Sequence, residues 1–263
     1  MPSGKSSKAV RNARSVVTAT KPKPWGTVAA VVAVLVFTGV IFGYLYVRYD
    51  EGRDLREALA PFTPSAENQD PSRQIDGVVA ETYQGSQHVT SQQRVAYDKS
   101  PPFGGPHDAV WAACNGVVYD DAVRTENLVH SLEHGAVWIT YDPGRVSGEA
   151  LASLQRRVEG QGYTVMSPYP GLDSPISLQS WGHQLELDSA DDPRIDQFIR
   201  ALRLNQYTYP EVGASCDAAP QFDVTNPPPF VAEPPGPGAV PMSGADATTG
   251  TGEMGGAQPP AGG

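Results

Sequence analysis

One uninterrupted apolar segment near the N-terminus limits how this chain can fold. The segment from Thr27 to Val47 reads TVAAVVAVLVFTGVIFGYLYV and contains 21 residues without a charge. As an α-helix it would be about 30 Å long, which matches the hydrocarbon core of a bilayer. Aromatic side chains suited to the membrane interface lie at its two ends, namely Trp25, Tyr44, Tyr46 and Tyr49. We therefore predict one transmembrane helix over residues 25–47.

The charges on the two sides of this segment predict its orientation. The first 24 residues carry six basic residues and no acidic residue, whereas the rest of the chain carries 13 basic and 29 acidic residues. Positively charged flanks stay in the cytoplasm, so we expect a single-pass protein of the cell membrane with a cytoplasmic N-terminus and an extracytoplasmic C-terminal domain. A cleaved signal peptide is the alternative, since Ala58-Leu59-Ala60 resembles a cleavage site. The apolar segment is, however, longer than the roughly 7–15 residues usual in signal peptides.

The acidic balance after residue 24 restricts the partners of the chain. A net charge of −16 in this part repels nucleic acids and anionic lipids. We therefore expect no nucleic-acid partner, and membrane contact through the single span. A protein partner in the cell envelope, of unknown identity, is compatible with this charge.

The chain has two cysteines, Cys114 and Cys216, and both follow the predicted membrane span. Disulfides persist in oxidising compartments outside the cytoplasm. Free thiols or metal ligands are the alternative, but neither cysteine belongs to a C-x-x-C pair. We predict a Cys114–Cys216 disulfide.

Composition divides the chain into five predicted segments. The end of the chain is rich in proline and glycine and has too few apolar side chains to offset the entropy of ordering. The segments are a basic cytoplasmic tail (1–24), the transmembrane helix (25–47), a juxtamembrane linker (48–74), a folded extracytoplasmic domain (75–222) and a disordered Pro/Gly-rich tail (223–263).

Within the folded domain, the hydrophobic patterns predict a mixture of helices and strands. Apolar residues at helical spacing predict helices over Glu126–His134, Ser147–Glu159 and Pro193–Leu204. Runs rich in β-branched and aromatic residues predict strands over Gln93–Tyr97, Ala136–Tyr141, Tyr163–Ser167 and Ile176–Leu187. This order predicts a single α+β domain with a mixed sheet and at least two helices, preceded by one transmembrane helix.

Four of the five histidines, His88, His107, His130 and His134, fall within 47 residues. Positions i and i+4 share one face of a helix, so His130 and His134 can reach the same ion. Imidazole binds zinc and copper well, and a carboxylate such as Glu133 can complete or orient the site. The alternative is that these histidines are surface or hydrogen-bonded residues without a ligand. His183 lies in a strand-like run and is expected to stand apart.

The segment His130-Ser131-Leu132-Glu133-His134 also fits the H-x-x-E-H pattern of inverzincin peptidases, in which the glutamate is the general base. Such enzymes carry the motif inside a long helix, whereas here Gly135 and a predicted strand follow at once. A zinc hydrolase with Glu133 as catalytic base is therefore an alternative only. We expect Glu211 to be structural. We also expect the tryptophans of the domain to belong to its core, namely Trp111, Trp138 and Trp181.

Several short motifs lie between about Ile75 and Cys216, among them Pro101 to His107 and Val129 to Gly135. Together they resemble an uncharacterised bacterial family, the domain-of-unknown-function 3105 family. Its members are frequent in actinobacteria and share a basic N-terminus, one membrane span and this domain. The similar positions are His88, Tyr97, Pro101 to His107, Trp111, Gly116 to Tyr119, Val129 to Gly135, Pro175 to Trp181 and Pro210-Glu211. This sequence has Gly104 in place of the usual Ser, and one additional residue before Gly116. The resemblance implies that the histidines and Glu133 act as one constellation.

These observations predict a membrane-anchored extracytoplasmic protein that binds a transition metal, copper or zinc, for binding, storage or delivery and not for turnover. The expected ligands are His88, His107, His130, Glu133 and His134. Two alternatives stay open, a zinc-dependent hydrolase and a non-enzymatic accessory or structural subunit of a cell-envelope complex.

Overall fold

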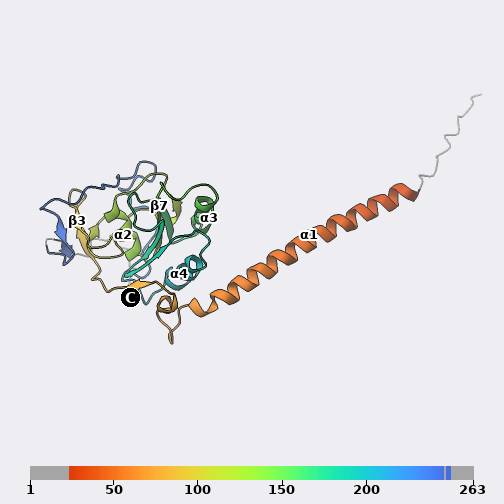
Figure 1. The fold of residues 1–263 in the computed structure, drawn as a ribbon, viewed down its shortest axis with the longest axis horizontal. Helices are drawn as coiled ribbons and strands as arrows, with labels where there is room; N and C mark the ends of the chain where they lie inside the picture. The colour runs from red at the N-terminus through yellow and green to blue at the C-terminus, as the bar shows by residue number, and fades with distance from the viewer. Residues whose placement is uncertain (1–23, 246, 250–263) are drawn as a thin grey trace, which may run out of the picture. The chain divides into compact units, whose positions relative to one another are not determined.

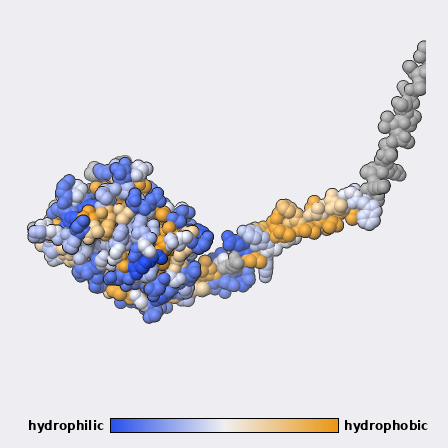
Figure 2. All heavy atoms as spheres, turned by 45° about the horizontal axis from the view of Figure 1, so that its top comes forward, coloured by the Kyte–Doolittle hydropathy of each residue, from blue (hydrophilic) through white to orange (hydrophobic). Residues whose placement is uncertain are grey.

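The first element of the chain is a long apolar helix. The computed structural model describes residues 24–245 and 247–249, so most of the predicted basic tail lies outside the described residues. Helix α1 (Pro24–Leu59) contains 36 residues and includes the whole predicted span. Figure 2 shows apolar residues in succession along this helix, and their side chains are exposed. Among the described residues it is the one helix long and apolar enough to cross a membrane.

The folded domain begins earlier than the sequence indicates. The boundary between the helical unit and the domain falls between Arg56 and Glu57. Two short 3₁₀ turns, η1 (Ala60–Phe62) and η2 (Pro71–Gln74), follow it, and both contact helix α4. Part of the expected linker therefore packs against the domain, because the partly buried side chain of Phe62 contacts the hydrophobic core.

A six-stranded mixed sheet forms the centre of the domain. Its strand order is β1-β9-β8-β6-β7-β5, in which β5, β6 and β7 run parallel and the other neighbours are antiparallel. The strands are β1 (Val79–Ala80), β5 (Asn115–Val118), β6 (Val137–Tyr141), β7 (Thr164–Pro168), β8 (Ile176–Ser180) and β9 (His183–Leu187). The expected α+β class with a mixed sheet is confirmed. Strand β5 is not among the strands predicted from the sequence, because only two β-branched residues, both valines, indicate it.

Helices cover both faces of this sheet (Figure 1). Helix α2 (Thr125–Glu133) lies on one face, and α3 (Gly148–Val158) and α4 (Arg194–Leu202) lie on the other. Successive residues of a strand point to opposite faces. Trp138 of β6 accordingly packs with the α2 side, while Val137 and Ile139 pack with α3 and α4. Two hydrophobic cores therefore meet at the sheet, and α2 is held between the sheet and the loops outside it.

Two smaller sheets lie beside α2. In one, β2 (Gln87–Val89) pairs in parallel with β4 (His107–Asp108) and antiparallel with β11 (Thr248–Thr249). In the other, β3 (Val95–Ala96) pairs in parallel with β10 (Val240–Pro241). The smaller sheets therefore join strands β10 and β11, late in the chain, to strands that precede α2.

The predicted start of the disordered tail, residue 223, is too early in the chain. Val240 is buried against the β3 region, and the carbonyls of Val231 and Glu233 accept hydrogen bonds from Arg94. Composition predicts disorder from the average of a segment, whereas here a few apolar side chains, including that of Phe230, each pack against the domain. Residues 246 and 250–263, the rest of that prediction, lie outside the described residues.

The predicted disulfide is confirmed, because Cys114 and Cys216 are bonded. The two residues are 102 positions apart, and Cys114 N also donates a hydrogen bond to Cys216 O at 2.9 Å. The bond therefore ties the segment after α4 to the segment that leads into β5.

Reduction of this disulfide should destabilise the domain. In the chain-entropy model, opening a loop of about 100 residues lowers the free energy of unfolding by roughly 5 kcal/mol. The measurement is thermal unfolding of the full-length chain in detergent micelles, oxidised and reduced. Thiol labelling of the unreduced, denatured chain should find no free sulfhydryl, and two labelled cysteines per chain would contradict the assignment.

Asp70 connects the segment after α1 to strand β9. Its Oδ2 lies 3.2 Å from His183 Nε2, and its carboxylate accepts hydrogen bonds from Ser72 and Arg73. Burial raises the pKa of Asp70, but these hydrogen bonds and the charge of His183 outweigh burial and hold that pKa well below its usual range. Because the folded-state pKa is depressed, this interaction stabilises the fold above pH of about 4 and is lost as the pH falls through the folded-state value.

Replacing Asp70→Asn should therefore lower the free energy of unfolding at pH 7. We expect a loss of about 1 kcal/mol, a moderate value because the carboxylate is only half-buried and water screens it. The difference from the unaltered chain should shrink as the pH is lowered below about 4. Thermal unfolding between pH 7 and pH 3 measures both effects. The exposed Asp121→Asn is the matched control, and an equal loss there would refute the role of Asp70.

Candidate metal centre

Helix α2 presents three polar side chains that can bind a metal. His130, Glu133 and His134 are spaced i, i+3 and i+4, which places them on one face of the helix turn. All three are buried, as is the rest of α2 from Glu126 onward. These polar groups therefore point into the protein and need polar partners there.

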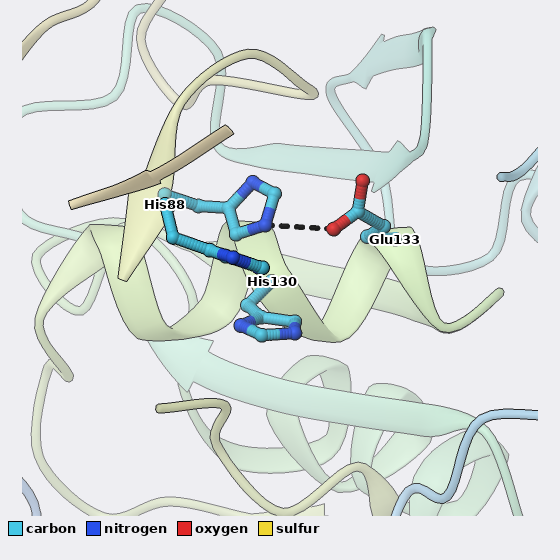
Figure 3. Close-up of side chains that lie close together, drawn as sticks. His88, His130 and Glu133 are labelled. Carbon is cyan, nitrogen blue, oxygen red and sulfur yellow. Dashed lines mark ion pairs between the residues drawn. The ribbon is translucent and has the colours of Figure 1, made fainter. Parts of the chain in front are cut away.

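Strands β2 and β4 bring two further histidines to the same place. The two strands are parallel, and their register sets His88 directly opposite His107. Neighbouring strands lie roughly 4.8 Å apart, so paired side chains on one face stand side by side. The centroids of the two rings are 5.0 Å apart. Figure 3 shows His130 and Glu133 on the helix, with His88 reaching the same place from a strand.

These residues form two groups that share one histidine. The ligand atoms of the first group all lie within 4.8 Å of one another, and we call it the inner group: His88, His107, His130 and Glu133. The second group is equally compact, and we call it the outer group: His130, His134 and Glu211. The expected convergence of four imidazoles thus holds for three of them. His134 faces Glu211 instead.

Backbone carbonyls orient three of the imidazole rings. Nδ1 of His107 lies 2.8 Å from Gly105 O, and Nδ1 of His130 lies 2.6 Å from Asp108 O. Nδ1 of His134 lies 2.6 Å from Ser215 O. A carbonyl oxygen can only accept, so each Nδ1 carries a hydrogen, and the neutral ring keeps its lone pair on Nε2. Metal-binding histidines are held by this kind of partner.

The contact between His107 and Glu133 needs a positive charge. His107 Nε2 lies 2.7 Å from Glu133 Oε2, and both side chains are fully buried. Burial raises the pKa of Glu133, but the hydrogen bond and charge of His107 and the backbone N–H of Ser86 outweigh burial and hold that pKa below its usual range. The first two of these lowering causes need a proton on His107 Nε2, so they describe the pair with a positive charge between its two atoms. A lone pair and an ionised oxygen repel at this distance unless a proton or a metal cation lies with them.

Aromatic side chains enclose the site. The ring centroid of Trp181 lies 5.8 Å from that of His107. The ring centroid of Trp111 lies 5.4 Å from that of His130 and 5.0 Å from that of His134. The prediction that the tryptophans belong to the core holds for Trp138 and Trp181, whereas Trp111 is partly buried and packs against two imidazoles.

His183 agrees with the expectation from the sequence, whereas Glu211 differs from it. His183 belongs to neither group, as expected, and its ring instead contacts Trp181 O and Asp70. Glu211 was interpreted as structural, but its Oε2 lies 3.3 Å from His134 Nε2. Spacing along the chain could not reveal this residue, because it lies 77 positions after His134. The signal in the sequence that could have identified Glu211 is the Pro210-Glu211 pair, which is among the positions similar to the family.

Comparison with known proteins places the chain in a family. Residues 88–218 match the family model described as "Protein of unknown function (DUF3105)". The chain belongs to this family. The matched segment of this DUF3105 protein contains every residue of the inner and outer groups and both cysteines. No curated protein and no solved structure matches the chain.

Gly135 follows Glu133 and His134 at the end of α2, and its replacement tests how tightly the helix end is packed. Its φ is +91°, and a Cβ there would lie 2.7 Å from the ring of Tyr209. Gly171 has a similar φ of +87° with open space around it. Gly135→Ala should therefore lower the free energy of unfolding by about 1–3 kcal/mol more than Gly171→Ala, because only the first adds overpacking to backbone strain. Thermal unfolding measures the difference, and equal losses would refute the packing argument.

Proposed function

We propose that this DUF3105 protein is a membrane-anchored extracytoplasmic protein that binds one transition-metal ion through the inner group. The contact between His107 and Glu133 is the observation that carries the proposal. A proton can join only two atoms, whereas the ligand atoms of four residues meet within 4.8 Å. A metal ion satisfies all four at once, and ligand bonds of about 2 Å fit a cluster of this size.

The ligand types favour zinc(II) or copper(II). Three imidazoles and one carboxylate are ligands that suit both ions. Both cysteines of the chain are in the disulfide, so no thiolate is available for a softer ion. The inner group also contains no methionine, which argues against a carrier of copper(I).

Three features support a membrane anchor with the domain outside the cytoplasm. Helix α1 has exposed apolar side chains over a bilayer's thickness, and basic residues precede it. The Cys114–Cys216 disulfide suits an oxidising compartment. The signal-peptide alternative is less well supported, because α1 continues as far as Leu59, inside the triplet that resembles a cleavage site.

The surroundings of Glu133 favour binding and delivery over catalysis. A general base must reach a water molecule, but Glu133 Oε1 accepts a hydrogen bond from Ser86 N at 2.6 Å and Oε2 faces His107. The H-x-x-E-H pattern also lies at the end of a nine-residue helix and not inside a long one. We therefore assign Glu133 as a ligand.

Metal analysis of the purified chain tests this function. The full-length chain in detergent micelles, stripped by a chelator and then supplied with zinc or copper alone, should retain one ion per chain. Replacing His107→Gln or Glu133→Gln should weaken binding by more than the roughly 10–100-fold that loss of a ligand's hydrogen-bond partner costs. Elemental analysis and competition with a chromophoric chelator give the stoichiometry and the dissociation constant.

His183→Gln is the matched control, because it removes an imidazole that belongs to neither group. It should leave stoichiometry and affinity unchanged. A chain that retains neither metal, or one that loses metal equally in all three variants, would overturn the proposal. The accessory-subunit alternative would then explain the protein better.

A further inference from the structure

The outer group repeats the feature that marks the inner group. His134 Nδ1 contacts Ser215 O, so the lone pair on Nε2 faces Glu211 Oε2 at 3.3 Å. Glu211 Oε2 is buried and accepts no hydrogen bond from the described residues. Ser86 links the two groups, because its N–H donates to Glu133 and its hydroxyl lies 3.5 Å from Glu211 Oε1. A cation bound by His134 and Glu211 would bring a positive charge to the buried Oε2 of Glu211.

His130 belongs to both groups but can serve only one ion at a time. Its Nδ1 contacts Asp108 O, so a single lone pair remains on Nε2 of the neutral ring. The centroid of its ring lies 4.6 Å from that of His107 and 4.7 Å from that of His134. His130 thus stands between the two groups, and an ion that uses it in one group leaves the other group without it.

Exposure differs between the two groups. In the inner group, His107, His130 and Glu133 are fully buried and His88 is 6% exposed. In the outer group, the side chain of Glu211 is 18% exposed. An ion that arrives from solvent therefore meets Glu211 before it can meet the fully buried ligands.

We infer that the outer group is the access site for the metal, and that the ion passes to the inner group by ligand exchange on His130. The inference rests on the proposed function of the inner group. In the exchange, the bonds from His134 and Glu211 are broken and bonds from His88, His107 and Glu133 form. The bond to His130 is kept, so the ion is never without a protein ligand. No electron or further reactant is needed, and the proton held between His107 and Glu133 is released to solvent when the ion takes its place.

This arrangement has a kinetic signature. A group on the path lowers the barrier in both directions, so its loss slows loading and release by the same factor and leaves the dissociation constant unchanged. A residue that only holds the inner ligands in place acts differently, because its loss speeds release and raises the dissociation constant.

Rapid-mixing measurements on Glu211→Gln test the access site. The full-length chain in detergent micelles is loaded with zinc or copper alone, and release is followed with excess chromophoric chelator. We expect loading and release each to slow by about tenfold or more, with a dissociation constant within about threefold of that of the unaltered chain. His134→Gln should behave in the same way. If His134→Gln fails to fold, Glu211→Gln decides alone, because its side chain is the more exposed.

The controls are Glu186→Gln, an exposed carboxylate of β9, and His183→Gln, and both should leave the two rates unchanged. Unchanged rates in Glu211→Gln, or faster release with a raised dissociation constant, would overturn the inference and leave the proposed function intact. Two ions bound at once in the unaltered chain would also overturn it, because His130 cannot serve both. If His107→Gln keeps full affinity while Glu211→Gln loses the ion, the proposed function fails and the outer group alone binds metal.

Discussion

A carboxylate that is buried against an imidazole nitrogen is the constraint on which the site depends. Glu133 Oε2 lies 2.7 Å from His107 Nε2, where neither side chain is exposed to water. A buried charge without a partner is strongly destabilising. The protein satisfies Glu133 Oε1 with the backbone N–H of Ser86 and leaves Oε2 toward the imidazoles. A positive charge between Glu133 Oε2 and His107 Nε2 would stabilise the buried carboxylate.

The fold holds these groups in place through backbone contacts. Carbonyls from the β4 region and from the segment before Cys216 orient the rings of His107, His130 and His134. Each ring is therefore held by a group whose own position is set by strand pairing or by the disulfide. In the proposed metal site, such fixed partners would favour tight binding, because they hold the ligands in place before the ion arrives.

The disulfide also holds the segment that completes the outer group. Ser215, whose carbonyl orients His134, directly precedes Cys216. The segment that carries Glu211 lies just before it and also binds the end of α2, since Glu211 N donates to Glu133 O. The outer group is therefore completed by a segment that the disulfide holds against the domain. An inner group for retention and an outer group for access would let a buried site exchange its ion.

The sequence by itself determined the features that depend on neighbouring residues. It predicted the apolar helix, the α+β class, the end of α2 at Gly135 and the shared face of His130 and His134, because helical spacing and backbone preference act over a few residues. It also predicted the disulfide, since the chain has only two cysteines. Only the tertiary structure decided that His88 lies opposite His107, and that Glu211 faces His134. Strand register and loop packing set these contacts, and both depend on the burial of side chains far apart along the chain.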